Sequence, residues 1–380
     1  MKKILFITNN LKGGGAEKYL VNLLKELKLK KRVDIEFELL LISEYGVYLD
    51  EVKDIINVDT ILKKNSILNE GKFIEKKYIR KILTCFRLIL IKYIFPYFLR
   101  GKFEKYDTII SFLEGPPTGI IRKIKNKKKI AWIHSDLRKA KTYYTKKENL
   151  ENYKNIDKII CVSNSAKNSF LELYPNYALK VEVIYNFINE REILEKSLEK
   201  IYYEKKKITL ITIGRLTIEK NQICLFKACK KLRREGIDFE LIVLGEGNKR
   251  KEYEKYLLEN KLQDRIKLLG FKKNPYPYLK LADIFILPSL YEGYGLVLCE
   301  AMILNKLIIC SDFEAGKEIL NNGKYGKLFK NNDCDDLVEK IKECYFNDER
   351  IKSIKSKLKE LDWQKSKDKI LKKIEQIILK

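Results

Sequence analysis

The chain of 380 residues is 45% hydrophobic and 34% charged, a balance typical of globular proteins that excludes an intrinsically disordered chain. Its length is too great for one ordinary core and favours two domains. Lysine and arginine outnumber aspartate and glutamate by 78 to 52, and the resulting charge of +26 favours nucleic acid, an anionic membrane or phosphorylated small molecules as partners, with a general lysine-rich composition as an equal alternative explanation.

The N-terminus and the cysteines indicate the compartment. The opening MKKILFITNN has an apolar run of only four residues, too short for a secretory signal, and is expected to form a buried strand. None of the 8 cysteines forms a Cys-x-x-Cys pair, and with one histidine in the chain zinc-finger spacing is absent. Most cysteines lie in apolar runs, where buried thiols are expected. The pattern favours a reduced, cytoplasmic protein.

Short apolar runs alternate with longer amphipathic stretches along almost the whole chain. This alternation predicts parallel strands that are buried on both faces by helices. The alternation restarts after a lysine-rich segment, 195–207, so we predict two doubly wound α/β domains, 1–186 and 187–362, followed by a helix, 363–380, that crosses back to the first domain. The expected strands are 3–8, 36–42, 107–112, 129–134, 158–163, 180–185, 208–214, 239–245, 266–270, 283–288 and 306–311.

One stretch, 76–102, departs from this alternation. It is not expected to span a membrane, because Arg87 and Lys92 interrupt its apolar residues and Pro96 breaks it. At 100° per residue its basic side chains fall within an arc of roughly 140°, opposite an aliphatic and aromatic face. We predict a basic amphipathic helix over 77–100 that lies on an anionic membrane, with an ordinary surface helix as the alternative. Its polar face is expected to carry Lys77, Arg80, Lys81, Arg87 and Lys92.

Two loops of the first half end expected strands, where α/β proteins build their sites. In GGGAEK, Gly13 and Gly15 match a dinucleotide-binding pattern, but Lys18 stands where its third glycine belongs. A flexible loop at a helix N-terminus remains, suited to close approach by a ligand, with a plain turn as the alternative. His134, the single histidine, ends another strand, and a site role is weighed against a structural one.

In the second half, Arg215 and Lys220 follow the strand 208–214 on a loop that enters a helix. Two cations there can neutralise a diphosphate, although a solvated basic loop is an equal alternative.

The segment LYEGYGLVLCEAM places Glu292 before a glycine turn and Glu300 inside the following helix. A carboxylate within such a helix can accept two ribose hydroxyls, while the helix N-terminus favours an anion. The paired carboxylates of hydrolytic glycosidases instead flank one scissile bond at short range. The arrangement predicts that Glu292 and Glu300 bind the two ends of one ligand.

Taken together, these segments resemble the retaining nucleotide-sugar glycosyltransferases of family 4, which have the GT-B fold of two Rossmann-like domains facing across a cleft. The resemblance spans nearly the whole chain, and its most specific part is the Glu-x7-Glu element formed by Glu292 and Glu300. SDFEAGKEIL keeps the acidic Glu318 but lacks the glycine pair often found before it. The other matching segments are GGGAE, WIHSDL, CVSNSAK, VIYNFIN, GRLTIEKNQ and VLGEGNKRKEYE.

The resemblance implies a role for each matching residue. Arg215 and Lys220 would hold the donor diphosphate, Glu300 the ribose hydroxyls, and Glu292 and His134 the transferred sugar. The remaining donor contacts would come from the glycine loop, the nucleobase site and the amides of the second glycine turn: Gly14, Gly15, Phe271, Lys272, Gly295, Leu296 and Val297.

The resemblance also implies the reaction: transfer of a hexose or N-acetylhexosamine from a UDP-sugar to a glycan or lipid-linked glycan acceptor. The configuration of the sugar would be retained by front-face attack, without a bound metal or cofactor. The expected pathway is biosynthesis of a cell-surface polysaccharide or glycoconjugate such as capsule or lipopolysaccharide, and the expected place is the cytoplasmic face of the membrane, with no nucleic-acid partner. The alternatives are a nucleotide-sugar 2-epimerase of the same fold and a non-catalytic protein that binds membrane or nucleic acid.

Overall fold

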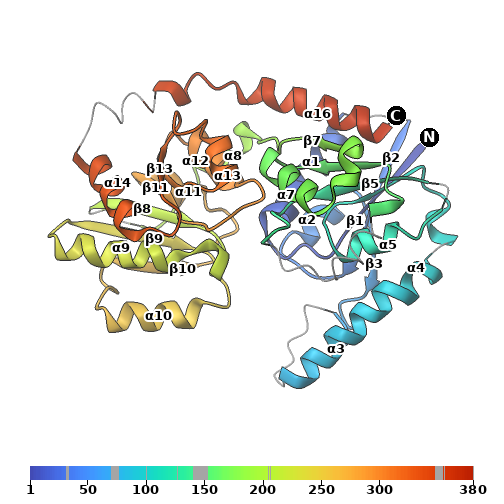
Figure 1. The fold of residues 1–380 in the computed structure, drawn as a ribbon, viewed down its shortest axis with the longest axis horizontal. Coiled ribbons are helices and arrows are strands. Elements are labelled where there is room, and N and C mark those ends of the chain that lie inside the picture. Colours follow the sequence, from blue (N-terminus) through green and yellow to red (C-terminus); the bar gives the residue numbers. More distant parts are fainter. Residues whose placement is uncertain are drawn as a thin grey trace. The chain divides into compact units, whose positions relative to one another are not determined.

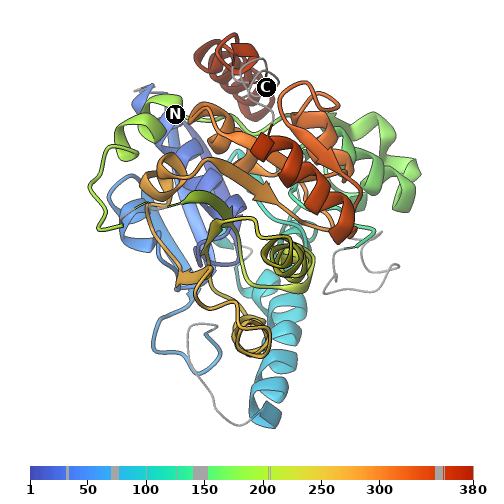
Figure 2. The ribbon, with the colours of Figure 1, turned by 90° about the vertical axis from the view of Figure 1, so that its left-hand side faces the viewer.

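The computed structural model describes residues 1–30, 34–69, 77–99, 101–125, 127–139, 153–203, 205, 207–346, 354 and 356–379. The chain divides into two units. Unit 1 comprises Met1–Asn186 with Leu371–Lys380, and unit 2 comprises Phe187–Ile370. Each unit is built on its own parallel sheet with helices on both faces (Figures 1 and 2). The prediction of two doubly wound α/β domains is therefore confirmed.

Unit 1 contains a seven-stranded sheet in the order β3-β2-β1-β4-β5-β6-β7. All of its strand pairs are parallel; for example, Ile4 of β1 is in register with Thr108 of β4. The strands are β1 Lys2–Thr8, β2 Ile35–Ser43, β3 Asn57–Leu62, β4 Thr108–Ser111, β5 Lys128–Ile133, β6 Lys158–Cys161 and β7 Val181–Val183. The helices are α1 Gly15–Leu29, α2 Leu49–Lys53, α3 Lys77–Ile89, η1 Leu90–Ile94, α4 Phe95–Phe98, η2 Gly101–Phe103, α5 Pro116–Ile121, α7 Asn164–Leu173 and η3 Pro175–Lys180.

Unit 2 contains a six-stranded parallel sheet in the order β10-β9-β8-β11-β12-β13. Its strands are β8 Ile208–Ile213, β9 Phe239–Leu244, β10 Ile266–Gly270, β11 Ile284–Leu287, β12 Leu307–Ser311 and β13 Lys327–Phe329. The helices are α8 Glu190–Lys196, η4 Ile218–Lys220, α9 Gln222–Arg234, α10 Arg250–Glu259, α11 Tyr276–Leu281, α12 Leu296–Ile303, α13 Glu314–Ile319 and α14 Cys334–Phe346. Helix α16, Trp363–Leu379, begins in unit 2 and ends in unit 1.

The direction of the chain explains the helix layers of unit 2. From β8 the chain moves outward to β9 and β10, then returns to β11 and moves the other way. Right-handed crossovers therefore place the helices of the two halves on opposite faces of the sheet. Helix α9 packs with α14, while α12 packs with α8 and α13. The strands between these layers are almost wholly apolar and buried, as their sequences predict.

Two strands were missing from the prediction, and both lie at sheet edges. β3 is only partly buried, and its sequence NVDTIL interrupts the apolar run with an aspartate. β13 has only three residues. Because an edge strand is covered less completely than a central one, it does not need a continuous apolar run.

The helical path from α3 through η1 into α4 runs past the expected break at Pro96. The N–H of Phe95 bonds the carbonyl of Leu90, five residues back, so η1 is a π-helical turn. Pro96 stands in the first turn of α4, where a missing N–H group is tolerated. Among the described residues, no helix meets the length and hydropathy that crossing a membrane requires.

Among the side chains that the structure describes in this helical segment, the exposed ones are mostly apolar, while those of Lys77, Arg80, Lys81 and Lys92 lie outside the described part. Arg87, expected on a solvated polar face, is only 7% exposed, so that expectation was wrong for this residue. The physical reason is packing: Ile91 of η1, one helical turn after Arg87, is buried, and η1 contacts α5, so this side of the helix faces the protein. The outward face carries exposed Ile79, Ile82, Phe86, Ile89, Ile94, Tyr97 and Phe98, which we call the apolar stripe. Figures 1 and 2 show α3 extending away from the sheet of unit 1.

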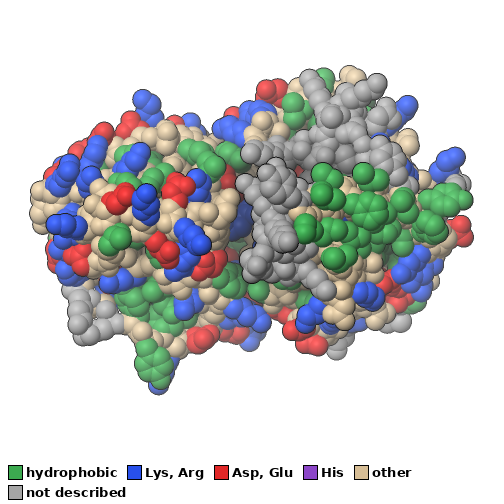
Figure 3. Space-filling model, turned by 90° about the horizontal axis from the view of Figure 1, so that it is seen from below, with side chains coloured by type: hydrophobic (Ala, Val, Ile, Leu, Met, Phe, Trp, Pro, Cys, Tyr) green, Lys and Arg blue, Asp and Glu red, His purple; other side chains and the backbone are tan. Residues whose placement is uncertain are grey.

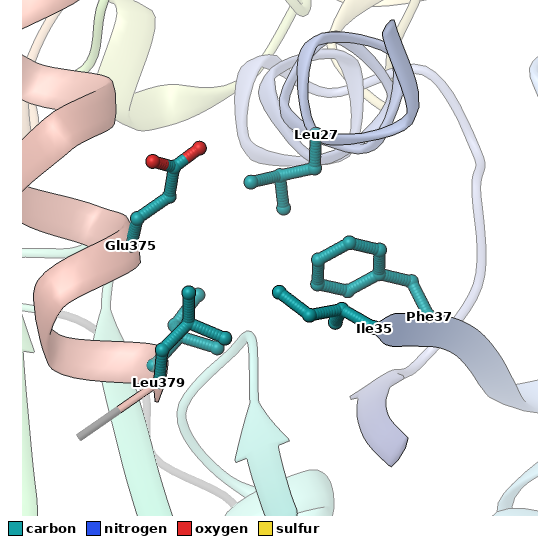
Figure 4. Close-up of a pocket in the computed structure, with 6 residues that line it drawn as sticks. Leu27, Ile35, Phe37, Glu375 and Leu379 are labelled. Atoms are coloured by element: carbon teal, nitrogen blue, oxygen red, sulfur yellow. The ribbon is translucent and has the colours of Figure 1, made fainter. Parts of the chain in front are cut away.

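The end of α16 packs on unit 1, against α1 and β2. A small gap there is lined by Leu27, Ile35, Phe37, Glu375, Ile378 and Leu379, and five of these are labelled in Figure 4. An ion pair of 2.6 Å joins Lys30 Nζ to Glu375 Oε1. Thr108 donates a hydrogen bond of 3.3 Å to the carbonyl of Ile378. The gap is a packing feature of the terminal helix and lies away from the predicted site residues.

Candidate functional site

The central strands of unit 2, β8 and β11, are neighbours, and the strand order reverses between them. In open α/β sheets ligands bind at such a reversal, beyond the carboxyl ends of the strands, because the two following loops diverge there. The loop after β8 carries Arg215 and Lys220, and the loop after β11 carries Glu292. Topology therefore brings the predicted donor-binding residues of unit 2 to one edge.

Lys220 and Glu292 form the centre of this edge. Lys220 Nζ lies 2.5 Å from Glu292 Oε1, and the two side chains are only 18% and 13% exposed. Lys220 ends the short helix η4, and its aliphatic carbons lie over Gly214: a Cβ at Gly214 would stand 3.5 Å from Lys220 Cδ. The pair is thus partly desolvated, which strengthens its interaction relative to a surface pair.

A second donor to Glu292 was missed in the sequence. Ser289 is fully buried just after β11, and its hydroxyl donates a hydrogen bond of 2.7 Å to Glu292 Oε1. The hydroxyl of Ser311, at the end of β12, in turn bonds the carbonyl of Ser289. The backbone N–H of Leu290 donates to the carbonyl of Glu219 at 2.8 Å, which ties the loop after β11 to η4. No sequence signal identified Ser289, because its contact with Glu292 depends on a turn of the chain between the two residues.

Arg215 lies on the same loop as Lys220 but on its exposed side. Its side chain is 66% exposed, and Nη2 is 3.5 Å from Glu219 Oε1. The structure therefore does not join its guanidinium to the Lys220–Glu292 pair. The backbone of Arg215, unlike its side chain, is held within the unit, because Gln222 Nε2 donates a hydrogen bond of 2.9 Å to the carbonyl of Arg215.

The second glycine turn forms the start of α12. Gly295, with φ +104°, has a backbone conformation that side chains with a Cβ rarely adopt. It caps the helix, whose first N–H groups, including those of Leu296 and Val297, have no intrahelical acceptor and point toward the N-terminus. The N–H of Leu298 returns to the carbonyl of Gly295 at 2.9 Å. Such a helix start favours an anion.

Glu300 lies in the second turn of α12 and is buried. The hydroxyl of Tyr276, at the start of α11, donates a hydrogen bond of 3.1 Å to Glu300 Oε1. Glu292 and Glu300 thus belong to different local networks. Tyr276 was also missed in the sequence. It lies on α11, which follows β10, whereas Glu300 lies on α12, which follows β11, so no local pattern connects the two residues.

The predicted nucleobase contacts follow β10, at the edge of the sheet. Phe271 is exposed, and Lys272 Nζ lies 5.8 Å from the ring centroid of Tyr278. β9 separates β10 from β8, so Phe271 and Lys272 lie at the carboxyl edge two strands away from the loop of Arg215 and Lys220.

In unit 1 the predicted residues also follow neighbouring strands. Gly14 caps α1 just after β1, and Gly15 begins the helix. His134 follows β5, and its backbone N–H donates a hydrogen bond of 3.0 Å to Glu114 Oε2, which follows β4. Because β1, β4 and β5 are adjacent, these residues share the carboxyl edge of one sheet. Glu114 was not singled out in the sequence.

The ring of His134 lies in an aromatic cluster. Its centroid is 4.8 Å from that of Phe112 and 6.3 Å from those of Trp132 and Tyr19. Within the described part of the chain, the enclosed Nε2 atom has no hydrogen-bond partner. Burial lowers the pKa of His134 to about 3, because the cluster disfavours the charged ring. His134 is therefore a neutral imidazole near pH 7.

Asp136, two residues further along, has a structural role. It is buried, and Arg138 pairs with both of its carboxylate oxygens, at 3.0 Å through Nε and 2.8 Å through Nη2. Its Oδ1 also accepts the backbone N–H of Arg138 at 3.1 Å. Among the described residues there is no group of three or more His, Cys, Asp or Glu side chains that could hold a metal ion.

Both halves of the chain match known glycosyltransferase families. Residues 13–192 match Glycosyltransferase Family 4, and residues 195–360 match Glycosyl transferases group 1. The chain resembles the Anabaena protein Alr3699/HepE, solved in complex with UDP and glucose, with a TM-score of 0.77 and 16% identity over 98% of this chain and 99% of that one. At this identity the likeness concerns the fold alone, and it confirms the expected GT-B fold.

Curated relatives match about half of the chain. One is the Campylobacter jejuni N-acetylgalactosamine-N,N'-diacetylbacillosaminyl-diphospho-undecaprenol 4-alpha-N-acetylgalactosaminyltransferase, 30% identical over 199 residues, which are 51% of this chain and 53% of the relative. Another is the Escherichia coli UDP-Gal:alpha-D-GlcNAc-diphosphoundecaprenol alpha-1,3-galactosyltransferase, 27% identical over 213 residues, 53% of this chain and 54% of the relative. The chain thus spans about half the length of these relatives. With its N-terminal half matching one glycosyltransferase family and its C-terminal half the other, the chain belongs to the GT-B glycosyltransferases of family 4 and group 1.

Proposed function

We propose that this protein transfers a hexose or N-acetylhexosamine from a UDP-sugar to a glycan or lipid-linked glycan acceptor in the biosynthesis of a cell-surface polysaccharide or glycoconjugate. The observation that carries the proposal is the partly buried Lys220–Glu292 pair, which lies where the strand order of unit 2 reverses. The relatives support the choice of acceptor and donor: their names specify diphospho-undecaprenol substrates and, in one case, UDP-galactose.

The donor would be held at three points. Its diphosphate carries negative charge, which Lys220, Arg215 and the amides at the start of α12 would neutralise. Glu300 would accept the ribose hydroxyls, and Glu292 would accept hydroxyls of the transferred sugar. In the site as described, Lys220 already has Glu292 as its counter-charge, so the diphosphate would share or replace this carboxylate.

The reaction would retain the configuration of the sugar. The acceptor oxygen would form its bond to the anomeric carbon on the face from which the β-phosphate oxygen departs, and that phosphate would accept the hydroxyl proton. Lys220 and the helix start would stabilise the charge that develops on the leaving UDP, which is the role a metal ion has in other transferases. The family resemblance assigns His134 to the transferred sugar and the loop of Gly14 and Gly15 to the donor, and a neutral imidazole can donate one hydrogen bond and accept another.

The acceptor would be reached at the cytoplasmic face of a membrane, through the apolar stripe. Its seven exposed residues form an aliphatic and aromatic face on α3, η1 and α4, and tyrosine and phenylalanine are common at bilayer interfaces. Figure 3, which views the molecule from the side on which α3 lies, shows a continuous apolar surface over this part of unit 1. The sequence around it, 76–105, contains nine basic residues and one acidic residue, which favours anionic lipids.

The test is a screen of UDP-glucose, UDP-galactose, UDP-N-acetylglucosamine and UDP-N-acetylgalactosamine for thermal stabilisation, with the corresponding GDP-sugars as controls. A ligand that binds only the folded state raises the melting temperature. The donor that stabilises most is then incubated with polyprenyl-diphosphate-linked sugars, with and without EDTA, and the anomer of the product is determined by NMR. Stabilisation by no nucleotide sugar would contradict the proposal, as would an inverted product for the retaining mechanism and inhibition by EDTA for metal independence.

A further inference from the structure

A buried hydrogen bond connects two helices of unit 2 at the predicted ribose position. The hydroxyl of Tyr276 donates to Glu300 Oε1 at 3.1 Å, and the two residues are 4% and 7% exposed. An ionised carboxylate only accepts hydrogen bonds, so a buried one requires donors. Tyr276 supplies such a donor from outside the helix that carries Glu300.

The position of Tyr276 is itself fixed by its surroundings. It begins α11 between Pro275 and Pro277, whose rings restrict the backbone on both sides. Its N–H donates to Asn274 Oδ1 at 3.2 Å, and Asn274 Nδ2 donates to the carbonyl of Lys196 at 2.8 Å, at the end of α8. The phenol ring therefore reaches Glu300 from a rigid turn that is anchored to a third helix.

Glu300 needs such a support if it is to bind a diol. A glutamate side chain has three rotatable bonds, and its freedom must be lost before its oxygens can accept two hydroxyls in a fixed geometry. The hydrogen bond from Tyr276 fixes one carboxylate oxygen before any ligand arrives. Preorganisation of this kind strengthens binding by reducing the entropy lost on association.

We propose that Tyr276 is a positioning residue that orients Glu300 toward the ribose diol and so gives the site its preference for ribonucleotides over 2′-deoxyribonucleotides. This inference rests on the proposed function, because it takes Glu300 as the acceptor of the ribose hydroxyls. Tyr276 acts through Glu300 and does not touch the nucleotide. Its effect is therefore largest for ligands that offer both hydroxyls of the diol to Glu300.

The test compares uridine diphosphate and 2′-deoxyuridine diphosphate as ligands in titration calorimetry. The wild-type protein is expected to prefer uridine diphosphate by about 10-fold or more, the worth of one charged hydrogen bond. Tyr276→Phe keeps the ring and removes only the hydroxyl. It should weaken uridine diphosphate binding by about 5- to 10-fold and weaken binding of the deoxy analogue, which offers Glu300 only the 3′-hydroxyl, by a smaller factor. The matched control, Tyr256→Phe, removes a hydroxyl from α10, a helix that carries none of the predicted donor-binding residues, and should leave both affinities unchanged.

A second comparison separates positioning from general support of the fold. In a Glu300→Ala background, Tyr276→Phe should cause no further loss of uridine diphosphate affinity, because the acceptor of its hydrogen bond is absent. Equal losses for both nucleotides, or an unchanged preference in Tyr276→Phe, would overturn the inference while leaving the proposed function intact. A wild-type protein that binds neither nucleotide would overturn both.

Discussion

Lys220 Nζ and Glu292 Oε1 lie 2.5 Å apart, although the two residues are separated by 72 positions in the chain. The ion pair joins the loop after β8 to the loop after β11, the two loops that diverge where the strand order reverses. It places a cation where a diphosphate is expected and supplies that cation with a counter-charge while the donor is absent. The paired charges avoid the high cost of an isolated buried ion.

Removing Lys220 or Glu300 should weaken donor binding. Lys220→Ala and Glu300→Ala each remove a charged group that we propose binds the donor, and such a loss typically costs about 2–4 kcal/mol, or roughly 30- to 1000-fold in affinity. Calorimetric titration with UDP measures this loss. Lys327→Ala is the matched control, because Lys327 is paired with Glu343 at 2.6 Å but lies at the amino end of β13, at the opposite edge of the sheet. Wild-type affinity in both site variants would refute the site assignment.

The Lys220–Glu292 pair should show measurable coupling in a double-mutant cycle. Because both side chains are largely buried, Lys220→Met and Glu292→Gln should give a coupling energy of about 1–3 kcal/mol in urea unfolding. Arg191 and Glu195 provide a control pair on the exposed surface of α8, for which no coupling is expected. A coupling energy for Lys220 and Glu292 that equals that of the control pair would show that the ion pair is not formed in solution.

His134 should remain neutral far below its ordinary pKa. As the chain contains one histidine, its ring gives a single set of imidazole signals in NMR. With the folded pKa near 3, these signals should not move between pH 8 and pH 5. A titration midpoint near 6.5 would show that the ring is solvated.

The same shift predicts how stability depends on pH. Between pH 6.5 and pH 3 the unfolded chain binds a proton at His134 and the folded chain does not, so the free energy of unfolding falls as the pH falls through this window. The slope is at most ~1.4 kcal/mol per pH unit. His134→Gln should lack this contribution, so the wild-type protein should lose more stability than the variant between pH 7 and pH 5. Parallel losses in urea unfolding would contradict the prediction.

The apolar stripe, and not Arg87, should carry membrane binding. Replacing Ile82, Phe86 and Ile89 with serine removes apolar side chains worth roughly 1 kcal/mol each on burial, so partitioning onto phosphatidylglycerol vesicles should fall by about 100-fold. Ile67→Ser is the control, since Ile67 is exposed in unit 1 but lies outside the stripe. Sedimentation with vesicles measures the binding. Equal binding of the triple variant and the wild type would refute membrane contact through this face.

The architecture could be predicted because it depends on local patterns. A strand that is buried on both faces is apolar along its length, so the central strands could be identified in the sequence as continuous apolar runs. Edge strands do not need a continuous apolar run, and β3 and β13 were therefore not predicted. The segments around Lys220, Glu292 and Glu300 were recognisable because their spacing is short and fixed within single loops and helices.

The contacts among these residues could not be predicted, because they join segments far apart in the chain. Ser289 reaches Glu292 only through the turn between them, and Tyr276 meets Glu300 only because α11 and α12 both pack against α8. Likewise, helical periodicity placed Arg87 with the other basic residues, but the packing of the adjoining η1 against α5 determined that this side faces inward. The sequence by itself determined the strands, the glycine turns and the charged groups near them. The tertiary structure decided which groups meet and which face is exposed, because both depend on how buried surfaces are shared between elements rather than on any local pattern.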